Sequence, residues 1–177
     1  MAGGLVLPCL SSQGGNGDST PSLRILVVED HETFRRFVCT TLGKRSEYCV
    51  VCEVSDGLEA VRKAEELQPD LIVLDIGLPG INGLEAARRI HKSCPASRIL
   101  FLSLESDANV VQESLRAGAL GYVDKKKAEV DLLAAVKAVS EGRRFVSSGL
   151  SAENCTAATD TFGAYANGDP LCPTPAV

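Results

Sequence analysis

The chain alternates between short, wholly apolar runs and longer segments in which apolar residues recur every three or four positions. Such short runs are typical of strands buried on both faces of a parallel sheet, and the longer segments have the periodicity of amphipathic helices. Strands are therefore predicted at residues 24–28, 48–54, 70–74, 98–102 and 121–123. Helices are predicted near residues 31–44, 57–67, 83–92, 106–117 and 128–141.

Five strands alternating with five helices predict an α/β fold with a doubly wound, five-stranded parallel sheet. Helices should cover both faces of the sheet, and the crossovers should be right-handed. Ser106 or Asp107 could cap the start of the fourth helix, and Gly118 fits its end.

The two ends of the chain differ in composition from its centre. Residues 1–22 are rich in Gly, Ser, Asn and Pro and are predicted to be a disordered arm. Residues 23–146 carry the alternating pattern and form one predicted domain. Residues 147–177 consist mostly of small and polar residues, so we expect a linker or a disordered tail there.

Composition narrows the range of functions. The chain has 177 residues, of which 45% are hydrophobic, but it contains no apolar run of the roughly 20 residues that a membrane helix needs. The amino terminus lacks the basic region of a signal peptide, so a cytoplasmic location is expected, with no membrane partner. Residues 21–146 hold all 18 basic residues and 19 of the 23 acidic ones, a near-neutral balance that indicates no nucleic-acid surface.

The seven cysteines do not predict a disulfide framework, because their number is odd and their spacing scattered. Cys49 and Cys52 form a CxxC pair, but they lie within a predicted strand, where positions three apart point to opposite faces. We interpret them as structural thiols.

Acidic residues follow two of the predicted strands. Asp75 ends the apolar run 71–74, and Glu29 and Asp30 follow the first strand. The carboxyl ends of parallel strands meet at one edge of the sheet, so these three carboxylates could share a crevice. Taken alone, Asp75 could equally be a helix N-cap, and Glu29 a solvated loop acid.

Residues 23–146 resemble the receiver domain of two-component response regulators, most closely the NarL/FixJ-like branch. Four segments in the order of the chain carry this resemblance: Val27-Val28-Glu29-Asp30, Leu74-Asp75-Ile76-Gly77-Leu78-Pro79 with Gly83, Leu102-Ser103, and Gly118-Ala119-Leu120-Gly121-Tyr122-Val123-Asp124-Lys125. The resemblance implies a flavodoxin-like (βα)5 fold with strand order 2-1-3-4-5.

The resemblance also implies a role for each matching residue. Asp75 would accept a phosphoryl group, because a carboxylate can act as a nucleophile. Lys125 and Ser103 would bind phosphoryl oxygens, and Tyr122 would be an aromatic switch that changes the face of helix 106–117 and strand 121–123. The implied ligands of Mg²⁺ are the side chains of Glu29, Asp30 and Asp75 and the backbone carbonyl of Gly77.

Some residues depart from the usual pattern of the family or have simpler interpretations. Glu29 stands where Asp is more usual, and the bulk of Leu104, after Ser103, could narrow access to Asp75. Ser103 could instead cap a helix, and Tyr122 could be ordinary packing. Lys125 is followed by Lys126 and Lys127, which we interpret as a solvated turn.

The leading hypothesis is that the chain is a phosphorylation-dependent signalling switch and not a turnover enzyme. A sensor histidine kinase or a phosphotransfer protein would donate the phosphoryl group. The resemblance also allows a homodimer. One alternative is a degenerate receiver that binds partners without phosphorylation. An aspartyl-phosphate phosphatase would need a second acid at position 77, where Gly77 stands, and a flavin- or nucleotide-binding protein would need a phosphate loop after the first strand.

The segment after Val146 lacks features of a DNA-binding output. It has no basic residue and no helical periodicity, so DNA binding by this chain is not expected. Both a stand-alone receiver and a regulator truncated or shifted out of frame after about Glu153 remain open.

Overall fold

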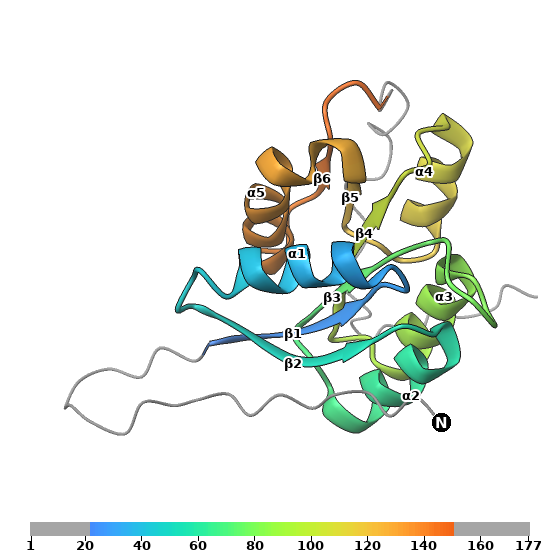
Figure 1. Cartoon of the computed structure of the whole chain (residues 1–177). Helices are drawn as coiled ribbons and strands as arrows, with labels where there is room; N and C mark the ends of the chain where they lie inside the picture. Colours follow the sequence, from blue (N-terminus) through green and yellow to red (C-terminus); the bar gives the residue numbers. More distant parts are fainter. Residues whose placement is uncertain (1–21, 151–177) are drawn as a thin grey trace, which may run out of the picture.

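A computed structural model of the chain describes residues 22–150, which form one parallel sheet covered by helices (Figure 1). The strand order is β2-β1-β3-β4-β5-β6, which confirms the predicted α/β fold and the order 2-1-3-4-5. The first five strands are β1 (Leu23–Val28), β2 (Tyr48–Val54), β3 (Leu71–Leu74), β4 (Arg98–Ser103) and β5 (Gly121–Asp124). The sixth, β6 (Phe145–Val146), is not predicted, because two residues are too few to show a periodicity.

Helices lie on both faces of the sheet. They are α1 (Glu32–Leu42), α2 (Gly57–Leu67), α3 (Gly83–Ser93), α4 (Ala108–Arg116) and α5 (Ala128–Ser140), and a short 3-10 helix, η1 (Lys125–Lys127), precedes α5. Helices α1 and α5 cover one face, and α2 and α3 cover the other, which α4 joins beside β4 and β5 (Figure 1). No helix among the described residues is both long and apolar enough to cross a membrane.

Alternate residues of the strands fill two separate cores. In β1, Ile25 and Val27 pack with α1 and α5, whereas Leu26 and Val28 pack with the helices of the other face. Because both faces are covered, every residue of β3 is buried. The wholly apolar runs of the sequence are thus explained by burial on both faces.

Polar side chains mark the starts of four helices. The caps are His31 for α1, Asp56 for α2, Asn82 for α3 and Asp107 for α4, each accepting one or two hydrogen bonds from backbone N–H groups of the first turn. Asp107 is thus one of the two caps predicted for the fourth helix. Because Asn82 caps α3, the carboxylate of Asp75 is left for another role.

The domain extends past its predicted C-terminal boundary at Val146. Residues 147–150, assigned to the linker by composition, pack against the domain, with Ser147 1% and Leu150 8% exposed. Residues 1–21 and 151–177, predicted as an arm and the rest of the tail, lie outside the described residues. Cys52 is a free, buried thiol, so it forms no disulfide with Cys49.

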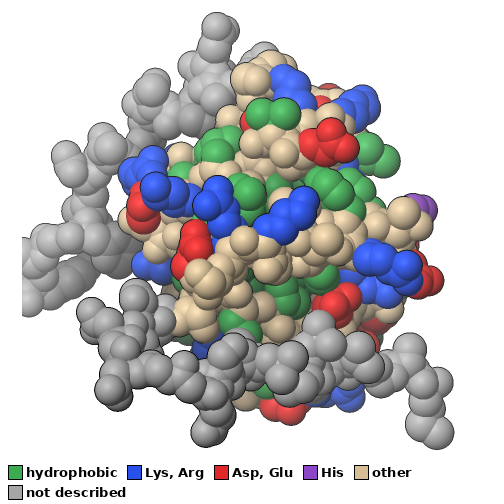
Figure 2. Space-filling view, turned by 60° about the vertical axis from the view of Figure 1, so that its left-hand side comes forward, with side chains coloured by type: hydrophobic (Ala, Val, Ile, Leu, Met, Phe, Trp, Pro, Cys, Tyr) green, Lys and Arg blue, Asp and Glu red, His purple; other side chains and the backbone are tan. Residues whose placement is uncertain are grey.

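The surface carries both signs of charge. On the face shown in Figure 2, Lys and Arg side chains lie among Asp and Glu side chains and do not form a field of one sign. This mixture agrees with the near-neutral balance of residues 21–146.

Gly83 allows the start of α3 to contact the end of β3 directly. A Cβ atom on Gly83 would lie 1.9 Å from the backbone oxygen of Asp75 and 2.8 Å from Cα of Ile76. The N–H of Gly83 also donates a 2.9 Å hydrogen bond to the carbonyl of Ile76. This contact fixes the backbone that presents the Asp75 side chain.

We predict that Gly83→Ala lowers the free energy of unfolding by about 2–4 kcal/mol, because the methyl group overlaps backbone that cannot move aside cheaply. Urea unfolding followed by circular dichroism measures the change. Gly43→Ala is the control: Gly43 has helical dihedral angles and a nearest contact of 3.2 Å, so its effect should stay below about 1 kcal/mol. Equal effects of the two substitutions would contradict the close contact at Gly83.

Candidate functional site

Four strands deliver polar side chains to the same edge of the sheet. Glu29 directly follows β1, Asp75 follows β3, Ser103 ends β4 and Lys125 follows β5. Since all four strands are parallel, their carboxyl ends meet there. They surround an open pocket of about 580 Å³, which is lined by Glu29, Asp30, His31, Phe34, Asp75, Ile76, Gly77, Ser103, Leu104, Glu105, Lys125 and Lys126.

Three carboxylates converge in this pocket, as predicted. Glu29, Asp30 and Asp75 offer oxygen atoms that all lie within 4.8 Å of one another. Glu29 and Asp75 are buried, at 2% and 6% exposure, whereas Asp30 is exposed. Burial raises the pKa of Glu29, an effect that the hydrogen bond from Lys125 opposes and the charge of Asp75 reinforces.

The carboxylate cluster fits a small, hard divalent cation such as Mg²⁺. Its donors are all oxygen atoms, and the exposed position of Asp30 leaves one side open to the waters that Mg²⁺ retains. Gly77, whose carbonyl is the fourth predicted ligand, lies in the lining of the same pocket. Every residue predicted to hold the metal is therefore at this one place.

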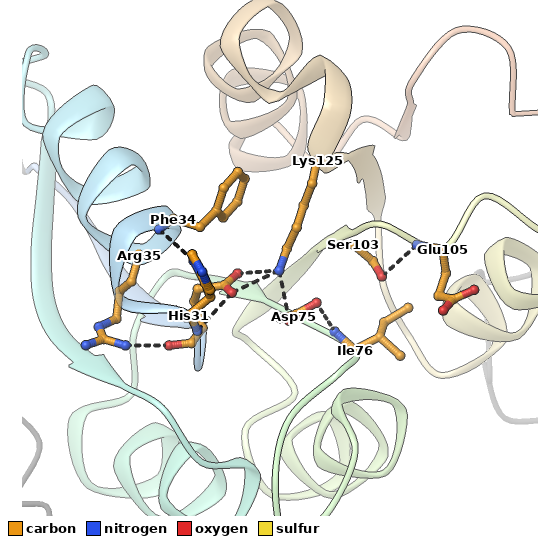
Figure 3. Close-up of polar contacts among 9 residues, drawn as sticks. His31, Phe34, Arg35, Asp75, Ile76, Ser103, Glu105 and Lys125 are labelled. Carbon is orange, nitrogen blue, oxygen red and sulfur yellow. Dashed lines mark hydrogen bonds and ion pairs between the residues drawn. The ribbon is translucent and has the colours of Figure 1, made fainter.

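Lys125 provides a cation that pairs with both buried acids. Its Nζ lies 2.7 Å from Oε2 and 2.9 Å from Oε1 of Glu29, and 2.9 Å from Oδ2 of Asp75. Figure 3 shows the side chain extending from the end of β5 to Asp75, beside Phe34. The Phe34 ring, whose centroid is 4.9 Å from Nζ, adds a cation–π contact.

The Asp75 carboxylate is held on both oxygens. Oδ1 accepts a 2.7 Å hydrogen bond from the N–H of Ile76, and Oδ2 faces the ammonium of Lys125 (Figure 3). The backbone N–H of Asp75 donates to the carbonyl of Val28 in β1. The side chain is thus buried, ionically paired and aimed into the pocket.

Glu29 is positioned by helix α1 as well as by the sheet. The N–H of His31 donates to Oε1 of Glu29, and Nη1 of Arg35 donates a 2.7 Å hydrogen bond to its backbone oxygen. Arg35 also pairs with Glu53 of β2 at 3.5 Å. Sequence reasoning missed Arg35. The signal in the sequence was the position of this arginine, one turn into the predicted helix that follows Glu29 and Asp30.

Ser103 and Tyr122 contact the same loop residue, Glu105. Oγ of Ser103 accepts a 3.2 Å hydrogen bond from the N–H of Glu105, and the Tyr122 hydroxyl donates to its backbone oxygen at 2.6 Å. Tyr122 is fully buried, and burial raises its pKa to about 12. Because Asp107 caps α4, Ser103 is not the cap of that helix.

Apolar residues also line the pocket. Phe34 and Ile76 line it, and Leu104, expected to narrow access to Asp75, lies at its rim with 61% of its surface exposed. The sequence placed Phe34 on the apolar stripe of a helix but gave no sign of its contact with Lys125. Of the other two lysines, Lys126 lines the pocket, whereas Lys127 contacts Ser148.

The sequence of the chain is similar to those of known proteins. Residues 25–137 match the family model of the response regulator receiver domain. The chain is 36% identical over 124 residues to the transcriptional regulatory protein DegU of Brevibacillus brevis, covering 70% of this chain and 52% of DegU. It is 33% identical over 125 residues to the response regulator GacA of Pseudomonas viridiflava, covering 71% of this chain and 58% of GacA. The chain therefore spans little more than half the length of these relatives.

Solved structures show the same fold. A two-component response regulator of the LuxR family from Aurantimonas sp. SI85-9A1 matches with a TM-score of 0.70 and 36% identity, over 73% of this chain and 92% of that one. The signal receiver domain of the putative response regulator NarL from Mycobacterium tuberculosis matches with a TM-score of 0.66 and 29% identity, over 69% and 98% of the two chains.

We predict that Lys125→Met lowers the free energy of unfolding by about 2–4 kcal/mol, because two buried carboxylates lose their shared cation. Added Mg²⁺ should restore much of this loss, since the metal would then be the only cation between the acids. Urea unfolding with and without Mg²⁺ measures both effects.

Arg88→Met is the matched control for the loss of an ion pair. Arg88 pairs with Glu113 at 2.6 Å, but the two side chains are 48% and 51% exposed, so the cost should stay below about 1 kcal/mol and be independent of Mg²⁺. A loss in Lys125→Met no larger than in this control would show that the buried pairs do not stabilise the site.

Proposed function

Because the chain belongs to the response regulator receiver domain family of two-component signalling, we propose that it is a phosphorylation-dependent switch with Asp75 as its phosphoacceptor. The donor would be the phosphohistidine of a sensor histidine kinase or of a phosphotransfer protein in the cytoplasm. One observation carries the proposal: a buried carboxylate faces an ammonium at 2.9 Å in a pocket with two further acids.

The proposed reaction transfers a phosphoryl group from the imidazole of the donor to the carboxylate of Asp75. A carboxylate oxygen of Asp75 attacks the phosphorus atom, the P–N bond to the donor imidazole breaks, and the imidazole leaves with the bonding electrons. The product is an acyl phosphate on Asp75. Attack of water on this phosphorus later releases inorganic phosphate and restores the carboxylate. In this proposal the phosphorylated state itself is the signal, so the domain would act as a phosphoacceptor and not as a turnover enzyme.

The chain's own residues supply the positioning and the charge. Lys125, already directed at Oδ2 of Asp75, would donate to one phosphoryl oxygen, and the Ser103 hydroxyl would donate to another. Glu29, Asp30, Asp75 and the carbonyl of Gly77 would hold Mg²⁺, which when bound offsets the negative charge of the phosphoryl group. The acids alone would repel a phosphoryl donor.

The output would travel from Ser103 through Glu105 to Tyr122 and α4. If Ser103 moves toward a phosphoryl oxygen, its hydrogen bond with the N–H of Glu105 is strained or lost, and Glu105 also anchors the Tyr122 hydroxyl. Helix α4 is the element best able to respond, because only Val111 and Ser114 of its nine residues are buried.

Two other functions are less well supported. An aspartyl-phosphate phosphatase would need an acid at position 77, where Gly77 lines the pocket. A degenerate receiver that works without phosphorylation would not need the arrangement of Lys125, Ser103 and three carboxylates around one pocket. The phosphoacceptor accounts for all of these groups.

We predict that the chain, incubated with Mg²⁺ and acetyl phosphate, gains the mass of one phosphoryl group and that Asp75→Asn does not. The carboxamide is a poor nucleophile, and it cannot form a stable acyl phosphate. Intact-protein mass spectrometry measures the gain, which a chelator should abolish.

Asp56→Asn is the matched control, since Asp56 caps α2 close to the same edge and asparagine caps a helix equally well. This variant should be labelled like the original protein. If Asp75→Asn is labelled as fully as the original protein, the assignment of Asp75 is overturned. If neither the original protein nor any variant is labelled, the degenerate receiver is favoured.

We also predict that phosphorylation changes amide hydrogen exchange in residues 104–116 more than in α2. The reason is that the loop before α4 carries the contacts to Ser103 and Tyr122, whereas α2 packs with α3, β1 and β2, on the other side of β3 from β4 and β5. Exchange measured with and without acetyl phosphate tests this, with Asp75→Asn as the blank. Unchanged exchange in residues 104–116 of the labelled protein would contradict the proposed route.

A further inference from the structure

The segment after α5 is attached to the strand that leads into the site. In β6, Phe145 pairs with Gly121 and Val146 with Tyr122, and the N–H of Ser147 then donates a 2.9 Å hydrogen bond to the carbonyl of Tyr122. Ser147 is 1% exposed. A residue that composition assigns to a linker therefore lies inside the domain, beside β5.

The hydroxyl of Ser147 attaches this segment to a second residue of β5, Asp124. Its Oγ accepts a 3.2 Å hydrogen bond from the backbone N–H of Asp124, and it donates a 2.6 Å hydrogen bond to Oδ2 of Asp131 in the first turn of α5. Donation to a carboxylate fixes the direction of the hydroxyl proton and leaves its lone pairs for Asp124. The side chain thus joins three parts of the chain: the segment after α5, the end of β5 and α5 itself.

Asp124 is the residue directly before Lys125. It pairs with Ser103 of β4, and its side chain caps η1 by accepting a 2.9 Å hydrogen bond from the N–H of Lys126. At the other end of η1, Nζ of Lys127 donates to the backbone oxygen of Ser148. The turn that presents Lys125 is therefore fixed to residues 147–148 at both of its ends.

We propose that Ser147 is a positioning residue for Lys125: it fixes the backbone from which the ammonium reaches Asp75. The inference rests on the proposed phosphoacceptor function. A lysine side chain is long and flexible, so its aim depends on where its Cα is held and in which direction the chain leaves. A small displacement of a charged group that contacts the transferred atoms lowers the rate of transfer markedly.

The experiment compares labelling rates with acetyl phosphate and Mg²⁺ in Ser147→Ala and Ser97→Ala. Ser97 is the matched control, a buried serine whose hydroxyl donates a 2.6 Å hydrogen bond to the carbonyl of Pro69, before β3 and at the far edge of the sheet. Both variants should lose similar stability. Only Ser147→Ala should be labelled more slowly, by about three- to tenfold.

A double-mutant cycle separates positioning from a general structural effect. In the Lys125→Met background, adding Ser147→Ala should cause no further slowing, because a residue that acts through Lys125 has nothing left to position. An equal slowing in both backgrounds would overturn the inference, as would wild-type labelling by Ser147→Ala. Ser147→Thr, which keeps the hydroxyl, should recover part of the rate.

Two further results keep the inference distinguishable from the proposed function. Asp131→Ala removes the outer partner of the Ser147 hydroxyl from a half-buried position on α5 and should slow labelling less than Ser147→Ala does. If Ser147→Ala does not fold, Asp131→Ala replaces it in the comparison. A wild-type labelling rate for Asp131→Ala would then reject the inference. If the original protein is not labelled at all, the proposed function fails and the inference falls with it.

Discussion

The domain depends on bringing like charges together at a buried edge and neutralising them there. Glu29 and Asp75 lie at the ends of adjacent parallel strands, almost without solvent, where a cation must offset the repulsion between their carboxylates. The ammonium of Lys125 supplies that charge from a third strand. The surrounding structure serves this arrangement: Gly83 fixes the backbone at Asp75, and Arg35 fixes the backbone at Glu29.

This constraint also explains how a small chemical change could be transmitted. A phosphoryl group or a metal ion in the pocket would change the charge around the Lys125 ammonium, which pairs with both Glu29 and Asp75. The rigid sheet cannot absorb such a change, because its two cores are closed by helices on both faces. The loop at Glu105 and the lightly buried helix α4 are the parts that can.

The sequence predicts the sheet and the acids at its edge for a physical reason, whereas Lys125, Ser103 and Tyr122 were implied only by the resemblance to receiver domains. Strands buried on both faces must be apolar throughout, so the runs ending at Glu29 and Asp75 were visible without any structure. Contacts that depend on register and side-chain direction were not visible. Arg35 and Phe34 belong to an ordinary amphipathic helix by pattern, yet one holds the backbone of Glu29 and the other lies against Lys125. Ser147 was assigned to a linker because the residues after Val146 are mostly small and polar, and composition does not show its hydrogen bonds to β5 and α5.

The packing of residues 147–150 moves the boundary of the domain. Composition puts that boundary at Val146, but the burial of Ser147 and Leu150 shows that these four residues belong to the domain. Anyone who joins this receiver domain to another protein should therefore splice beyond Leu150. A junction made at the end of α5 would preserve five strands and five helices, but the chimaera would lack the hydrogen bonds from residues 147–148 to the segment around Lys125.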